Sequence, residues 1–136
     1  MYNKRLCVYV AGKYSDTSIE AVLNNIRIGI ATSRELLLAG YAPFCPWLDF
    51  QYIITMTNNE FDIWDKRIMY DYALAWLDKA DCMLLLPAPT EDSVGVNMEL
   101  ARSRERGIPI FTDIDELDYF RVKTERVHTT SENQGD

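Results

Sequence analysis

The stretch DCMLLLP, residues 81–87, is the most hydrophobic segment of the chain and decides its fold. Its apolar residues run from Cys82 to Leu86 without a polar interruption. A short and continuous apolar run of this kind is typical of a β-strand that is buried on both faces. Strands of that type belong to parallel sheets, so we predict that this is the central strand of a sheet covered by helices on both sides.

Strands and helices alternate on either side of this central strand. Three further segments are short and apolar and are predicted to be strands, at residues 4–12, 41–50 and 108–113. Four segments place apolar residues at helical spacing, at residues 19–39, 63–79, 94–106 and 115–122. Residues 49–62 show neither period, and we predict a loop or an irregular lid there.

This alternation predicts a single α/β domain over residues 1–122. The expected fold is a flavodoxin-like or Rossmann-like three-layer sandwich with a parallel sheet of four to five strands. Residues 123–136 are polar, and we expect a disordered tail there. In such sheets a ligand binds beyond the carboxyl ends of the strands, so the site is expected at that edge.

Composition argues against several classes of function. The net charge of −7 disfavours binding to duplex nucleic acid, although a small anionic ligand can still bind where the surface is locally positive. No apolar run approaches the roughly 20 residues that span a bilayer, so we expect no membrane partner and a cytoplasmic protein. The three cysteines are dispersed, which favours buried thiols over disulfides or a zinc site. We therefore expect neither a metal nor a cofactor.

The chain contains one histidine, His128, and it lies in the polar tail. Ser–His–Asp triads, Cys–His pairs and HExxH zinc sites all need a histidine near the reacting atoms. Any catalysis is therefore expected to depend on carboxylates, assisted by a tyrosine or a helix dipole.

The stretch DSVGVNMEL, residues 92–100, opens the helix after the central strand and carries the candidate site. Ser93 is a natural N-cap, and Gly95 lets a ligand approach the backbone, although both residues also fit an ordinary capped helix. The free N–H groups of the first turn favour an anionic group such as phosphate. Glu99 is either a nucleophile at a sugar carbon or a solvated acid. It stays ionised if the helix dipole and hydrogen bonds outweigh desolvation.

Three residues from other elements are candidates to join Glu99. Tyr9, on the first strand, could hydrogen-bond a carboxylate or pack in the core. Trp47 belongs to an aromatic cluster after the second strand, where it could stack on a base or pack within the loop. Asp71 is the carboxylate of the second helix that could approach a ligand.

Together these features resemble the nucleoside 2-deoxyribosyltransferase-like family, which includes the 2′-deoxynucleoside 5′-monophosphate N-glycosidases. The resemblance covers residues 5–112 and rests on VYVAG, AWLDKADCMLLLP and DSVGVNMELARSRERGIPIF. Its most specific part is the spacing Ser-x-Gly-x-x-x-Glu, from Ser93 to Glu99. The chain is also similar to small uncharacterised bacterial and phage proteins related to that family.

The resemblance implies a reaction and a role for three residues. The reaction is cleavage or transfer of the N-glycosidic bond of a (deoxy)nucleoside or nucleoside 5′-monophosphate, through a covalent glycosyl–enzyme intermediate. Glu99 falls on the nucleophile, Tyr9 on the tyrosine that positions it, and Ser93 on the serine that binds the 5′-phosphate. On the same ground we expect a small-molecule substrate and a homo-oligomer, a dimer or larger.

Two departures from the family pattern stand out. The family aspartate that contacts or protonates the base is replaced by Ala73, and Asp71 takes over only if the helix starts late or is irregular. Lys13 follows Gly12 where the glycosidases carry a serine, and its charge could pair with a phosphate. The missing aspartate leaves a second interpretation open, a non-catalytic nucleotide-binding or regulatory module on the same fold.

Overall fold

The computed structural model describes residues 4–63, 66–87 and 92–134 of the chain. Its strands are β1 (Cys7–Ala11), β2 (Ala42–Phe44), β3 (Cys82–Leu85) and β4 (Ile110–Phe111). They pair in parallel in the order β2-β1-β3-β4. The helices are α1 (Ile19–Leu38), the 3₁₀ helix η1 (Pro46–Thr55), α2 (Asn58–Ile63), α3 (Lys66–Leu77), α4 (Val94–Arg106) and α5 (Ile114–Gln134). The predicted α/β fold with a parallel sheet is confirmed, and the described part of the sheet has four strands.

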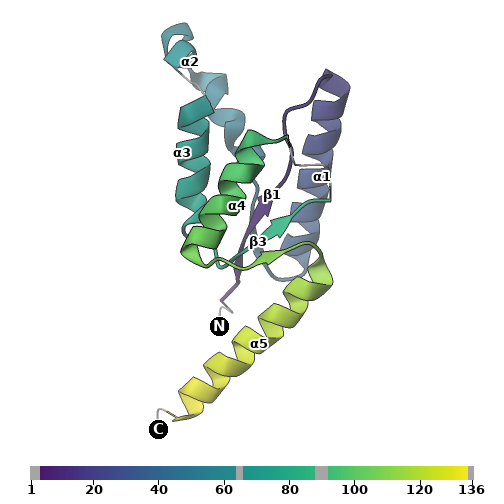
Figure 1. Cartoon of the computed structure of the whole chain (residues 1–136), viewed down its shortest axis with the longest axis vertical. Helices are drawn as coiled ribbons and strands as arrows, with labels where there is room; N and C mark the ends of the chain where they lie inside the picture. The colour runs from purple at the N-terminus through teal and green to yellow at the C-terminus, as the bar shows by residue number, and fades with distance from the viewer. Residues whose placement is uncertain (1–3, 64–65, 88–91, 135–136) are drawn as a thin grey trace.

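The sheet separates two hydrophobic cores, because side chains along a strand alternate between its faces. Val8 of β1 lies in one core with Leu36 of α1 and Leu117 of α5. The next residue, Tyr9, points to the opposite face and lies in a second core with Leu77 of α3. Helices α1 and α5 therefore cover one face of the sheet, and α3 and α4 cover the other, as a three-layer sandwich (Figure 1).

Helices α1 and α4 each begin at a serine cap, and the cap of α4, Ser93, is the one predicted. The Ser18 hydroxyl accepts a hydrogen bond from the Ala21 N–H at 3.1 Å, which caps α1. The Ser93 hydroxyl accepts one from the Val96 N–H at 3.3 Å, which caps α4. Gly107 ends α4 in the left-handed conformation, with φ of 69°, a region that glycine enters without steric cost.

The prediction of an irregular segment at residues 49–62 is wrong, because η1 and α2 occupy most of it. Helix α2 begins at a reciprocal cap. The Thr57 N–H donates to Glu60 Oε1 at 3.0 Å, and the Glu60 N–H donates to Thr57 Oγ1 at 3.3 Å. This capping box satisfies two N–H groups that a short helix would otherwise leave free. The start of α2 was therefore visible in the sequence as Thr-x-x-Glu.

Helix α3 is shorter than the helix predicted over residues 63–79. The residue after its last helical position, Asp78, accepts two hydrogen bonds from the Arg102 guanidinium of α4, each of 2.7 Å. Arg106 adds an ion pair to the same carboxylate at 3.5 Å. These bonds fasten the end of α3 to α4, so the two helices lie side by side on one face of the sheet (Figure 1).

Helix α5 is longer than predicted, because it continues beyond Val122 to Gln134. Residues 123–134, which we predicted to be a disordered tail, belong to this helix and carry it away from the sheet (Figure 1). They are polar but include neither glycine nor proline, and the Thr124 hydroxyl donates to the Phe120 carbonyl at 2.9 Å. Neither α5 nor any other helix among the described residues is long and apolar enough to cross a membrane.

Candidate active site

A cavity of about 420 Å³ lies beyond the carboxyl end of β1, at the N-terminus of α4. Four parts of the chain line it, namely residues 12–15, Pro46, three residues of α3, and residues 92–96 with Glu99. This is the edge at which parallel sheets of this kind bind their ligands. The volume falls within the usual range of small-molecule sites.

The structure brings most of the predicted site residues to this one cavity. The residues that line it as predicted are Gly12, Lys13, Ser93, Gly95 and Glu99. Tyr9 lies behind them in the core, against Glu99. Of the remaining two, Asp71 lies elsewhere, and the side chain of Trp47 is outside what the structure describes.

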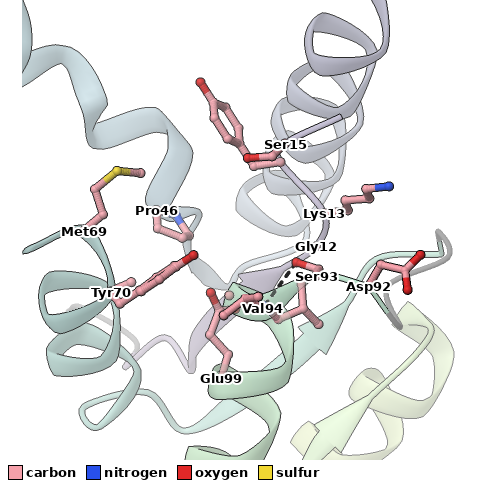
Figure 2. A pocket seen from close by; sticks show the side chains of 14 residues that line it. Gly12, Lys13, Ser15, Pro46, Met69, Tyr70, Asp92, Ser93, Val94 and Glu99 are labelled. Atoms are coloured by element: carbon pink, nitrogen blue, oxygen red, sulfur yellow. Dashed lines mark hydrogen bonds between the residues drawn. The ribbon is translucent and has the colours of Figure 1, made fainter. Parts of the chain in front are cut away.

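Glu99 points from α4 into the cavity (Figure 2). Burial raises its pKa from the ordinary value of 4.5 to about 8, and the nearby Tyr9 hydroxyl opposes this rise only in part. Its Oε2 atom is buried and has no hydrogen-bond partner among the described residues. Within the described chain, Glu99 therefore lacks the hydrogen bonds that would keep its carboxylate ionised. Desolvation outweighs the hydrogen bond from Tyr9, and with a pKa of about 8 the group is mostly protonated at neutral pH.

Tyr9 is the neighbour that faces Glu99 from β1. Its side chain is fully buried, and its ring lies 5.8 Å from that of Phe44, centroid to centroid. Burial and the adjacent carboxylate raise the pKa of Tyr9 far above its ordinary value of 10, so the phenol stays neutral.

Tyr9 and Glu99 are close enough for each to shift the pKa of the other. Even so, neither Tyr9 Oη nor Glu99 Oε2 has a well-aligned hydrogen-bond partner among the described residues. The pair is therefore close but not tightly bonded. Buried polar atoms left without a partner cost free energy, and such atoms concentrate at functional sites.

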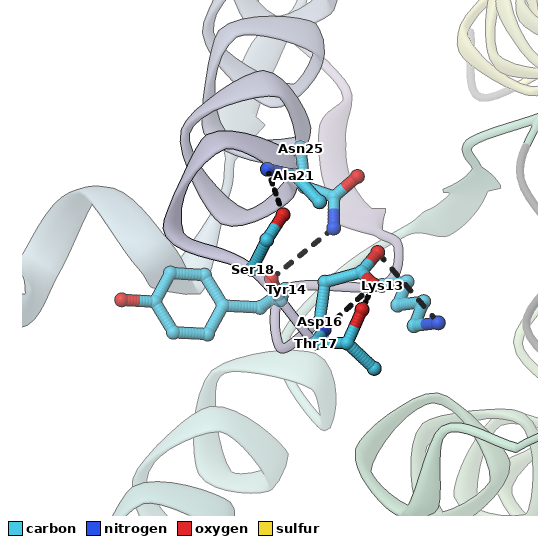
Figure 3. Close-up of polar contacts among 7 residues, drawn as sticks. All are labelled: Lys13, Tyr14, Asp16, Thr17, Ser18, Ala21 and Asn25. Atoms are coloured by element: carbon cyan, nitrogen blue, oxygen red, sulfur yellow. Dashed lines mark hydrogen bonds and ion pairs between the residues drawn. The ribbon is translucent and has the colours of Figure 1, made fainter.

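Lys13 carries the one positive charge among the described residues that line the cavity. Its ammonium pairs with Asp16 at 3.8 Å (Figure 3). The Asp16 carboxylate also accepts a hydrogen bond from the Thr17 N–H at 2.8 Å, and this bond together with Lys13 lowers the pKa of Asp16. Asn25 of α1 donates to the Tyr14 carbonyl at 3.2 Å, which ties the loop to the helix. The loop therefore holds Lys13 at the rim of the cavity.

Gly95 also accommodates a neighbouring aromatic side chain. A Cβ atom at this position would lie 3.3 Å from Cε1 of Tyr70, which is tighter than ordinary van der Waals contact. The glycine therefore makes room for the ring of Tyr70 on α3, in addition to lining the cavity. The prediction that Gly95 lets a ligand approach the backbone stays a prediction.

Asp71 does not reach the cavity. It is exposed on α3, whereas Met69, Tyr70 and Ala73 of the same helix line the cavity. Residues 71 and 73 of a regular helix point about 200° apart, and α3 is regular over this region. The prediction that Asp71 replaces the missing carboxylate is therefore wrong. Ala73, 7% exposed, closes the wall with a methyl group.

Tyr70 is the residue that the sequence reasoning missed. It precedes Ala73 by three positions, and residues three apart on a helix share a face. The spacing of three could have predicted its position, because a helix that turns Ala73 toward a ligand turns Tyr70 toward the same side.

No protein-family model matches the chain, and no curated protein matches it either. Among the described residues, no group of three or more His, Cys, Asp or Glu side chains gathers that could hold a metal ion. Fold and site together define an α/β protein whose described residues place the carboxyl group of Glu99 in a cavity large enough for a small molecule. The family resemblance and the homo-oligomer remain predictions.

Proposed function

We propose that this protein cleaves or transfers the N-glycosidic bond of a nucleoside or a nucleoside 5′-monophosphate. The observation that supports the proposal is the buried Glu99 carboxyl group, which faces the neutral Tyr9 phenol at the wall of the cavity. A carboxylate in this setting is a suitable nucleophile toward an anomeric carbon.

Polarity within the cavity suggests the direction in which a substrate lies. Lys13, Ser93 and the N-terminus of α4 favour the anionic or hydroxyl-bearing end of a ligand. Met69 and Pro46 line the other side with apolar surface that suits a planar base (Figure 2). Between them, Glu99 would meet the sugar.

The reaction would proceed in two displacements. A Glu99 oxygen attacks C1′, the bond from C1′ to the base nitrogen breaks, and its electron pair leaves with the base. A glycosyl ester on Glu99 results. Water then attacks C1′ and releases the sugar, or a second base attacks and accepts it, and either step returns the carboxylate.

The raised pKa of Glu99 has a consequence for this mechanism. With a pKa of about 8, roughly one tenth of the free protein carries the carboxylate at pH 7. Positive charge that develops on the sugar in the transition state stabilises the ionised form, because the two charges meet in a water-poor site. Tyr9 supports the same form as a neutral donor.

The test is a turnover panel. The protein is incubated with deoxyribo- and ribonucleosides and their 5′-monophosphates, with and without an acceptor base, and free base or exchanged nucleoside is measured by chromatography. We expect turnover by the wild type and its loss in Glu99→Gln. Glu105→Gln, on the exposed surface of the same helix, is the matched control. Absence of turnover throughout, or equal turnover by the wild type and Glu99→Gln, would refute the proposal.

A second candidate is a non-catalytic nucleotide-binding or regulatory module. Two observations favour it, namely the methyl group of Ala73 where a carboxylate was expected and the protonated state of Glu99 at neutral pH. Thermal stabilisation by nucleotides without any turnover in the same panel would select this function.

A further inference from the structure

We propose that the Tyr70 hydroxyl is the proton donor to the departing base. The inference rests on the proposed function and assigns a residue to a step that Glu99 and Tyr9 leave open. A nucleobase leaves as a poor anion unless it is protonated, so a donor at the base end of the cavity accelerates cleavage.

The position of Tyr70 is well defined. It is half-buried on α3, and its ring packs against α4 at the one place where α4 has no side chain, with Cε1 3.3 Å and Cδ1 4.0 Å from a Cβ built on Gly95. Figure 2 shows the hydroxyl end of the ring directed into the cavity, toward the space that the Glu99 carboxyl group also faces. A nucleophile and a proton donor thus share one space.

The other polar groups of the cavity are placed differently. Lys13, Asp92 and Ser93 lie on the side of the cavity away from Met69 and Pro46 (Figure 2). Lys13 is also engaged with Asp16. Tyr9 lies behind Glu99, and its raised pKa makes it a poor acid. Tyr70 thus stands beside the apolar surface proposed for the base, and Tyr14, the other tyrosine that lines the cavity, is the alternative that the test must exclude.

The step balances over the two displacements. In the first, Glu99 bonds to C1′, the bond from C1′ to nitrogen breaks, and the phenolic proton of Tyr70 passes to the base. In the second, the tyrosinate takes a proton from the water whose oxygen attacks C1′, and the ester electrons return to Glu99. Nucleoside and water are consumed, and sugar and base are formed, with Tyr70 and Glu99 restored.

The test compares Tyr70→Phe with the wild type on two classes of substrate. The phenylalanine keeps the ring against Gly95 and removes only the hydroxyl. On nucleosides we expect kcat/KM to fall by about 10²- to 10⁴-fold, the range typical of lost general acid catalysis. On a 4-nitrophenyl glycoside of the same sugar, whose leaving group needs no proton, we expect a change of less than about threefold. A merely structural role would lower both rates equally.

Two further variants sharpen the result. Tyr119→Phe removes the same atom from an exposed ring on α5 and should leave both activities unchanged. Ala73→Asp combined with Tyr70→Phe puts a carboxyl group on the same wall and should restore part of the activity on nucleosides. Thermal melting of each variant confirms that it is folded.

The outcomes separate the inference from the function on which it rests. If the wild type cleaves nucleosides and Glu99→Gln does not, but Tyr70→Phe is as active as the wild type, the inference is overturned and the proposed function stands. The inference also falls if Tyr14→Phe, at the other tyrosine of the cavity, shows the leaving-group dependence instead. A wild type without any turnover overturns both.

Discussion

Replacing Glu99 with glutamine should stabilise this protein at high pH even as it removes activity. Burial raises the pKa of Glu99 from 4.5 to about 8, so the native state holds a proton that the unfolded state releases. At about 1.4 kcal/mol for each pKa unit, the difference between 4.5 and 8 corresponds to about 5 kcal/mol as an upper limit. Glutamine fills nearly the same volume and carries no charge, so it avoids this cost.

The free energy of unfolding falls with rising pH because the native state keeps a proton that the unfolded state releases. Below pH 4.5 the carboxyl group is protonated in both states and costs nothing. Between 4.5 and about 8 it ionises in the unfolded state alone, so the free energy of unfolding falls as pH rises. Above a pH of about 8 the carboxyl group is ionised in both states, and the free energy of unfolding falls no further on its account. The advantage of Glu99→Gln should therefore grow from about 1 kcal/mol at pH 5 to about 3 at pH 7 and 5 at pH 9.

The assay is urea denaturation of the wild type and Glu99→Gln at these three pH values, with the unfolding free energy obtained by linear extrapolation. Glu105→Gln serves as the control, because the Glu105 side chain lies on the same helix and is 70% exposed. The difference in unfolding free energy between Glu105→Gln and the wild type should vary little with pH. If the difference for Glu99→Gln is also constant between pH 5 and pH 9, the reasoning about its burial is wrong.

Three further predictions concern the reaction, the ligand and the helix pair. In the wild type, kcat/KM should rise about tenfold per pH unit below the pKa of Glu99, about 8, and level off above it; a flat profile would exclude an ionised Glu99 as the active form. Lys13→Ala should raise KM for nucleoside 5′-monophosphates about tenfold and leave KM for nucleosides unchanged, and an equal effect on both would contradict a phosphate contact. Asp78→Asn should lower the free energy of unfolding at low salt, because it weakens the two hydrogen bonds from Arg102; denaturant unfolding at low and at high salt should show that the loss shrinks as salt screens these charges.

Where a structural signal is local, it could be recognised in the sequence. The apolar run from Cys82 to Leu86 predicted a buried strand, and β3 lies inside the sheet between β1 and β4. The spacing of Ser93, Gly95 and Glu99 predicted a capped helix with a carboxyl group one turn after Gly95, and α4 has both. The missed capping box at Thr57 belongs here as well, since its two hydrogen bonds join residues three apart.

Other features depend on which elements pack together. Asp71 and Tyr70 are adjacent in the chain, and only the docking of α3 against α4 decides that Tyr70 enters the cavity while Asp71 faces solvent. Gly95 illustrates the same point, because its lack of a side chain matters for an aromatic ring from another helix.

By itself, the sequence determined the alternation of strands and helices, the parallel sheet and the edge at which a ligand would bind, because these follow from hydrophobic periodicity and capping along the chain. The tertiary structure alone decided the protonation of Glu99 and the partners it meets. A carboxyl group is ionised or neutral according to how much water and how many donors surround it, and here Tyr9 of β1 and the walls of the cavity come from segments far apart in the chain.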